Sequence, residues 1–304
     1  GDKLPDFEHE AAAAASLGQV NRATLHDGRK VACKLQYPDM HSAIDADLKQ
    51  LKMIFSIYER YDKAISTKHV HSELAERLYE ELDYELEAQH MKLYDYMLRA
   101  EDSVHIPEVV ESHSTNRLLT ATWQDGGKLM SYINDDVEVR NQIALNMFKA
   151  WYVPLYHYGI IHGDPHLGNY SIRADHSINL MDFGCVRIFP PRFVQGSVDL
   201  YHALMNNDTA LAVHAFESWG FHDLSKEHIE TLSIWAGFLY GPLMDDKIRP
   251  IGEVTNGIYG RETAEKVHQK LRELGGITIP REFVFMDRAA LGLGSVFLQF
   301  FFFF

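Results

Sequence analysis

The amino-acid sequence predicts an α+β protein of two lobes, in which a small mixed lobe with a β-sheet and long helices precedes a larger, mostly helical lobe. Three observations predict this arrangement: a hairpin pattern near the N-terminus, two long helical patterns after it, and a mostly helical remainder beyond the Asp125-Gly126-Gly127 turn. We therefore expect one lobe over residues 1–125 and the other over residues 126–304.

The elements of the first lobe follow from the periodicity of the side chains. Residues 19–26 and 30–36 alternate apolar and polar side chains around Asp27-Gly28, which predicts a β-hairpin. Apolar residues recur at helical spacing over 44–61, and a second helix, acidic in its middle, is expected over about 71–98. A strand-like stretch, NRLLTATW, then precedes the turn.

The second lobe is expected to be mainly helical. Residues 139–159 have a helical pattern that ends near Gly159, and a polar loop and the short apolar strand 178–181 follow. The sequence closes on Phe300–Phe304. We interpret this run as the end of a truncated amphipathic helix, with a membrane-facing patch as the alternative.

The composition is that of a globular protein with an acidic surface. The 304 residues are 46% hydrophobic and 24% charged, and 29 Lys and Arg stand against 43 Asp and Glu, for a formal net charge of −14. This balance argues against nucleic acid as a partner, because neutralising phosphates requires clustered cations. The two cysteines have no metal-like spacing, which fits a reducing, cytoplasmic setting.

The strongest chemical signal is the stretch IIHGDPHLGNYSIRADHSINLMDFG, residues 160–184. Asp164 and Asn169 lie five positions apart in a polar loop, and Asp182 follows an apolar strand directly. Phosphoryl transfer from ATP needs one Asp to orient the acceptor, and an Asn and a second Asp to hold Mg²⁺. The glycine after Asp182-Phe183 is expected to let the backbone turn so that the carboxylate faces the site.

A lysine and an acidic helix supply the second signal. Lys34 in VACK lies on the opposite face of a predicted strand from its apolar neighbours, where an ammonium can pair with phosphate oxygens. A lysine in such a site needs a carboxylate to hold it, and Glu81, Asp83 and Glu87 in EELDYELEA are the candidates.

The alanine run Ala11–Ala15 has two interpretations. Taken alone it predicts helix, because alanine is the strongest helix former. Its position ahead of the Lys34 strand instead favours a nucleotide loop made of Ala13, Ala14, Ala15 and Ser16, which offers backbone N–H groups and a hydroxyl to phosphate. Since alanine lacks the positive-φ freedom of glycine, we expect a stiff, partly helical loop.

Five motifs in this order, AAAASLGQV, VACKLQYP, EELDYELEA, HGDPHLGN and DFG, resemble the UbiB-type atypical protein-kinase-like family, which supports ubiquinone biosynthesis. The resemblance covers roughly residues 10–190 and implies a two-lobed protein-kinase-like fold. It implies that ATP or ADP is held by the alanine loop, by Lys34 and by the E-x-D motif, Glu81 to Asp83. It also implies that Glu87 holds Lys34, that Asp164 is the catalytic-loop aspartate, and that Asn169 and Asp182 bind Mg²⁺.

The sequence departs from this family and from ordinary kinases in informative ways. No K-x-G-Q motif precedes residue 11, and no A-P-E segment follows Gly184. Because the A-P-E segment is absent, we expect an acceptor other than protein: a lipid or quinone precursor, a small molecule, or water. The family resemblance implies association at the inner face of a membrane. The alternatives are a small-molecule phosphotransferase of the aminoglycoside-kinase type, which shares the H-G-D-x-x-x-x-N loop, and a nucleotide-binding pseudokinase scaffold.

Overall fold

The chain forms two compact units, neither of which is one continuous stretch of sequence. The computed structural model describes residues 4–15, 17–61, 68–244 and 247, and then 265–271, 273–275, 277, 280–283, 286, 289, 292–294 and 296. The first unit comprises Gly1–Ala100, His105–Gly126 and Asn179–Cys185, and the second comprises the remainder. The boundaries between the units fall within the short strands β4 (Val104–His105) and β9 (Ile178–Leu180), and also after Ala100, Gly126 and Cys185.

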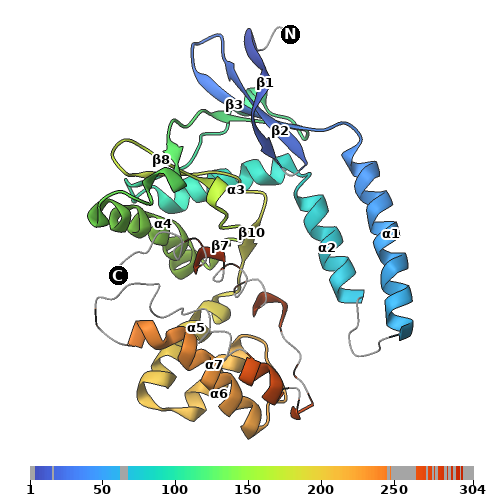
Figure 1. Ribbon diagram of the computed structural model, residues 1–304, viewed down its shortest axis with the longest axis vertical. Coiled ribbons are helices and arrows are strands. Elements are labelled where there is room, and N and C mark those ends of the chain that lie inside the picture. The colour runs from blue at the N-terminus through green and yellow to red at the C-terminus, as the bar shows by residue number, and fades with distance from the viewer. Residues whose placement is uncertain are drawn as a thin grey trace. The chain divides into compact units, whose positions relative to one another are not determined.

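The first unit contains an antiparallel sheet of four strands (Figure 1). Its order is β1 (Asp6–Ala15), β2 (Gly18–Thr24), β3 (Lys30–Gln36) and β5 (Leu118–Thr122). The predicted hairpin is confirmed as β2 and β3. Its turn uses Gly28 at φ +85°, and the Asp27 carboxylate accepts the Arg29 backbone N–H at 3.0 Å.

The partly helical loop expected at Ala13–Ala15 is wrong, because these residues end strand β1. Their backbones pair with β2, Ala13 opposite Val20 and Ala15 opposite Gly18. Helix propensity is a weak local preference, and pairing with the edge of a neighbouring strand overrides it. The fully buried Asn21 helps to fix the irregular register farther along β1 by donating to the Glu8 carbonyl at 3.0 Å. Ser16 lies outside the described residues.

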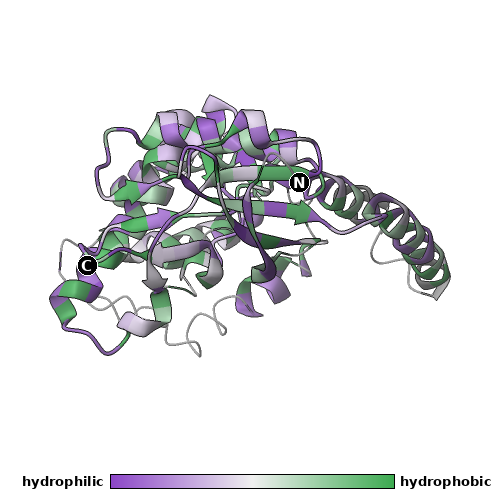
Figure 2. Cartoon of the chain, turned by 90° about the horizontal axis from the view of Figure 1, so that it is seen from above, coloured by the Kyte–Doolittle hydropathy of each residue, from purple (hydrophilic) through white to green (hydrophobic). Residues whose placement is uncertain are grey.

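Three helices accompany the sheet in the first unit: α1 (Met40–Tyr61), α2 (Lys68–Glu80) and α3 (Tyr84–Leu98). The single helix predicted over 71–98 is therefore two helices, broken at residues 81–83. The break follows from Asp83, whose carboxylate accepts the Leu86 backbone N–H at 2.9 Å and caps α3 from a non-helical conformation. Helices α1 and α2 pack side by side, and Figure 2 shows hydrophobic and hydrophilic residues interleaved along them.

The second unit is mostly helical. Helix α4 (Val137–Tyr158) ends at Gly159, as predicted, because Gly159 adopts φ +69° where a Cβ would lie 2.9 Å from the Phe189 carbonyl oxygen. The other elements of this unit are β6 (Gly127–Lys128), β7 (Ile160–His162), β8 (Tyr170–Ile172), β10 (Val186–Ile188), α5 (Pro191–Asn206), α6 (Thr209–Ser218) and α7 (Lys226–Met244), with short 3₁₀ turns at Leu129–Tyr132 and Leu167–Asn169. A further 3₁₀ turn, Glu111–His113, belongs to the first unit. Strands β7 and β10 pair antiparallel.

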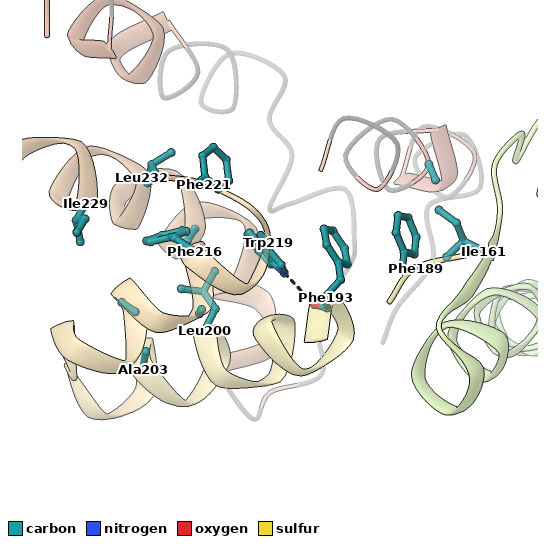
Figure 3. Close-up of a cluster of buried hydrophobic side chains, with 14 residues drawn as sticks. Ile161, Phe189, Phe193, Leu200, Ala203, Phe216, Trp219, Phe221, Ile229 and Leu232 are labelled. Atoms are coloured by element: carbon teal, nitrogen blue, oxygen red, sulfur yellow. Dashed lines mark hydrogen bonds between the residues drawn. The ribbon is translucent and has the colours of Figure 1, made fainter. Parts of the chain in front are cut away.

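An aromatic cluster forms the core of the second unit (Figure 3). Phe193 stacks on Trp219 with ring centroids 5.8 Å apart, and the Trp219 indole donates to the Phe193 carbonyl at 3.0 Å. Ile161 of β7 belongs to the same cluster, so the core supports the strand that leads into the loop containing Asp164. Within the described part of the chain, no helix combines the length and the apolar character that crossing a membrane requires. Phe300–Phe304 lies outside that part.

Candidate active site

Lys34 is the centre of a compact charge cluster in the first unit. It lies on β3 between Val20 of β2 and Leu119 of β5, so both flanking strands fix its backbone. Its Nζ donates to both carboxylate oxygens of Glu87 on α3, at 2.8 and 2.9 Å. The contact expected between these two residues is therefore present, and both are largely shielded from water, with 17% and 3% of the side chains exposed.

Glu87 also connects the lysine to the Asp182-Phe183-Gly184 turn. Its Oε1 accepts the Phe183 backbone N–H at 3.3 Å, and Asp182 Oδ1 lies 3.5 Å from Lys34 Nζ. One positive and two negative charges therefore meet at this point, which leaves one net negative charge. Such a cluster has the sign and the oxygen donors that suit a bound cation.

Burial and charge set the pKa values of this cluster together. Burial on its own would lower the pKa of Lys34, but the charges of Glu87 and Asp182 outweigh it and raise that pKa, so the lysine stays a cation. Burial raises the pKa of Glu87, and the nearby Asp182 charge adds to this, against the opposing effect of Lys34. The Tyr84 ring lies 5.3 Å from Lys34 Nζ, and burial raises the pKa of its hydroxyl to about 12.

The Asp182 backbone turns in a way that the sequence did not indicate. The left-handed conformation belongs to Asp182 itself, at φ +61°, and Gly184 has no positive φ. Gly184 contributes differently, by donating its backbone N–H to Asp182 Oδ1 at 3.2 Å. Phe183 anchors the turn, since its side chain is fully buried with its ring centroid 5.1 Å from that of Tyr94. Asp182 remains 43% exposed above this anchor.

Residues of the E-x-D motif have a clear structural role at the start of α3. Asp83 caps α3 from an exposed position, while Leu82 is buried against Ile44 and Leu48 of α1. Glu81 is half-buried beside them. The turn therefore orients α3, and with it Glu87, toward the lysine. Binding of nucleotide by Glu81 and Asp83 stays a prediction.

Two residues beside Lys34 were missed by the sequence reasoning. Gln36 is buried, and its side-chain amide donates to the Leu82 carbonyl and to the Asn116 carbonyl, the latter at 3.4 Å. At Gly18 a Cβ would lie 2.2 Å from the Leu35 carbonyl oxygen. A polar residue at the end of one predicted strand and a glycine directly before the other were the available signals, because each usually marks a buried hydrogen bond or a close approach.

The loop after β7 holds Asp164 and Asn169 in the second unit. The Asp164 carbonyl accepts the His166 backbone N–H and the Asn169 side-chain amide, both at 2.8 Å. The His166 ring accepts the Gly168 backbone N–H at 3.1 Å. These bonds fix the loop while the Asp164 side chain stays exposed. Burial, together with the Asp164 charge, raises the pKa of Tyr170 directly after the loop.

The donors at both loops fit magnesium. Asn169 donates its side-chain NH₂ group to Asp164, so its amide oxygen is the atom of this side chain that could ligate a cation. Asp182 supplies a carboxylate that is only partly buried. Mg²⁺ prefers such oxygen ligands, takes one or two from protein and keeps several waters.

Comparison with protein families gives one match over most of the chain. The model of the ABC1 atypical kinase-like domain matches residues 2–216. The chain is 32% identical over 209 residues to Activity of bc1 complex kinase 7, chloroplastic, of Arabidopsis thaliana, covering 67% of this chain and 30% of that protein. It is 28% identical over 243 residues to atypical kinase COQ8B, mitochondrial, of Danio rerio, covering 77% and 38%.

More distant relatives cover more of the chain. AarF domain-containing protein kinase 1 of Xenopus laevis is 27% identical over 290 residues, 90% of this chain and 52% of that protein. The chain thus spans between about a third and a half of the length of these relatives. A solved complex of Rv3197 with erythromycin from Mycobacterium tuberculosis has a TM-score of 0.75 at 23% identity, covering 99% of this chain and 75% of that one. With the family match, this confirms the predicted α+β, protein-kinase-like fold.

Proposed function

The chain belongs to the ABC1 atypical kinase-like family, and on that premise we propose that it is an ATP- and magnesium-dependent phosphotransferase or ATPase. The observation that carries the proposal is the position of Lys34 between Glu87 and Asp182. A lysine held in this way presents a fixed positive charge to phosphate oxygens. Because its pKa is raised, it keeps that charge throughout the physiological range.

Each remaining site residue has a proposed role of its own. Asp182 and Asn169 are the magnesium ligands, and the bound ion supplies charge compensation for the phosphate oxygens. Asp164 orients the acceptor through its exposed carboxylate, which is able to accept a proton from a hydroxyl or a water. Glu87 acts on Lys34 and on the turn behind Asp182, and the strand residues Ala13–Ala15 line the nucleotide phosphates with Ser16.

We propose a lipid or quinone-precursor acceptor, or water, in preference to a protein substrate. Helix α5 begins at Pro191, only seven residues after Gly184, and β10 occupies three of the intervening positions. This short connection has no room for the long activation segment with which ordinary kinases dock peptides. The resemblance to the UbiB-type family supports a role near isoprenoid lipids at a membrane surface. It favours this reading over an aminoglycoside-kinase-type phosphotransferase.

ATP turnover tests the proposal directly. Phosphate release is measured for the wild type and for Asp182→Asn, with and without cardiolipin-containing liposomes and quinone-like phenols. We expect turnover in the wild type, an increase with lipid or phenol, and loss in the variant. Turnover that survives in Asp182→Asn would contradict the catalytic role. A rise in melting temperature with Mg-ATP but no turnover would indicate a pseudokinase scaffold, and no rise would exclude nucleotide binding.

A further inference from the structure

Gly292 lies against the proline that follows Asp164. A Cβ at position 292 would be 2.8 Å from Pro165 Cγ and 3.4 Å from its Cδ, and the first distance is closer than side chains tolerate. Pro165 is buried, so its ring is enclosed on this side by the glycine. Figure 1 shows a dark red helical segment from near the C-terminus beside β7, the strand that leads into this loop. The match to the family model ends at residue 216, well before this glycine.

A neighbouring C-terminal residue belongs to the same core cluster as the strand that enters the loop. Ala289 is fully buried in the cluster that contains Ile161 of β7 and Phe189 (Figure 3). Leu293 and Val296 are buried as well, with 5% and 4% exposed. The described residues within 289–296 are therefore anchored in the core at several positions. These buried neighbours hold Gly292 in place against Pro165.

A displacement at Pro165 must pass to Asp164. Ring pucker absorbs part of a displacement of Cγ, but because the ring is closed onto its own backbone the remainder is transmitted to the main chain. On its other side, the loop is fixed by the two hydrogen bonds that the Asp164 carbonyl accepts. A side chain at position 292 therefore shifts the Asp164–Pro165 backbone.

We propose that Gly292 is a positioning residue: the C-terminal segment 289–296 sets the position of Asp164 by packing a bare glycine against Pro165. The inference rests on the proposed role of Asp164 in ATP chemistry. It assigns a function in turnover to a segment beyond the matched family domain. Nucleotide affinity should not depend on it, because Gly292 contacts the loop through Pro165 alone among the neighbours that a Cβ would meet.

Two glycines two residues apart provide a matched pair of variants. At Gly294 a Cβ would meet nothing within 4 Å, and both glycines are helical. Alanine therefore adds the same helix propensity at both positions, and only Gly292→Ala adds the contact with Pro165. We expect Gly292→Ala to lower kcat for ATP turnover by about 10-fold to 100-fold, the scale of an ångström-sized misplacement. Its affinity for Mg-ATP should change less than about twofold, and Gly294→Ala should match the wild type on this scale.

Removing the proline ring tests whether the effect passes through it. In a Pro165→Ala background, Gly292→Ala should lower kcat little or not at all, because the colliding Cγ is gone. If Gly292→Ala unfolds the protein, the double variant should restore both folding and turnover, and failure to restore them overturns the inference. If the wild type turns over ATP and the two variants Gly292→Ala and Gly294→Ala have equal kcat, the inference is also overturned. Absence of turnover in the wild type counts against the proposed function itself.

Discussion

Glu87 holds Lys34 with both of its carboxylate oxygens, at 2.8 and 2.9 Å, and the same carboxylate accepts the backbone N–H of Phe183. One side chain therefore ties β3, α3 and the turn carrying Asp182 together. The lysine cannot move away from the helix without leaving a buried carboxylate unpaired, and the turn cannot move without losing a charge-assisted hydrogen bond.

Breaking this pair should destabilise the fold as well as abolish activity. Glu87→Gln leaves the buried Lys34 charge with Asp182 as its remaining partner, so we expect a loss of about 3–5 kcal/mol in the free energy of unfolding. Urea denaturation measures the loss, and ATP turnover should be undetectable. The apolar pair Lys34→Met with Glu87→Leu is the control: it should recover most of the stability but none of the turnover. A recovery of turnover would contradict the role of the lysine.

Tyr84 makes stability fall at alkaline pH. Its folded-state pKa of about 12 lies above the value of 10.0 for a free tyrosine, so the folded state keeps the proton longer. The stabilisation is complete below pH 10 and is lost as the pH rises toward 12, by up to about 2–3 kcal/mol. The wild type should therefore lose stability relative to Tyr84→Phe over this range. Absorbance at 295 nm should show one tyrosine fewer titrating near pH 12 in the variant.

Gly18 is required for the close contact of β2 with β3. Gly18→Ala places a methyl group 2.2 Å from the Leu35 carbonyl oxygen, next to Lys34, so the strands must separate. We expect a loss of about 1–3 kcal/mol in the free energy of unfolding and a weaker thermal shift with Mg-ATP. Gly237→Ala, in α7 where a Cβ meets nothing within 4 Å, should be neutral or slightly stabilising. Equal behaviour of the two variants would contradict this account.

The two possible roles of Asp83 can be separated by one atom. Asp83→Ala removes the cap of α3 and should cost about 1 kcal/mol of stability, whereas Asp83→Asn keeps a good capping side chain and removes only the charge. Thermal unfolding of both variants tests the cap. The thermal shift with Mg-ATP tests the charge: a smaller shift in Asp83→Asn indicates nucleotide or metal binding. An unchanged shift assigns the residue to helix capping alone.

Much of the site was predictable because its chemistry is encoded in residue types with strict requirements. Lys34 on a strand surrounded by apolar residues needs a carboxylate, and the acidic helix offered few. That need left Glu81, Asp83 and Glu87 as candidates, and the family resemblance implied that Glu87 is the partner. The strand at Ala11–Ala15 was not predictable from local preference, because its stabilising partner is the backbone of β2, which any sequence can pair with.

The break between α2 and α3 had a local signal that helical periodicity concealed, whereas two other features had none. The helical spacing of 71–98 continues through residues 81–83, yet Asp83 followed by Glu85 and Glu87 is a recognisable helix start. The contact between Gly292 and Pro165 joins residues more than a hundred positions apart, and no spacing rule relates them. The left-handed turn at Asp182 depends on where Phe183 is buried, which only the assembled core decides.

The backbone conformation of Asp182 restricts which amino acids fit at this position. At φ +61°, most side chains are disfavoured, and only Asn, Asp and Gly are common. Of these, aspartate alone supplies a full negative charge. Glutamate carries the same charge, but it would strain the backbone at this positive φ. The position thus requires a residue that both tolerates a positive φ and carries a negative charge. Asn is consequently the replacement that removes the charge and leaves the shape in place.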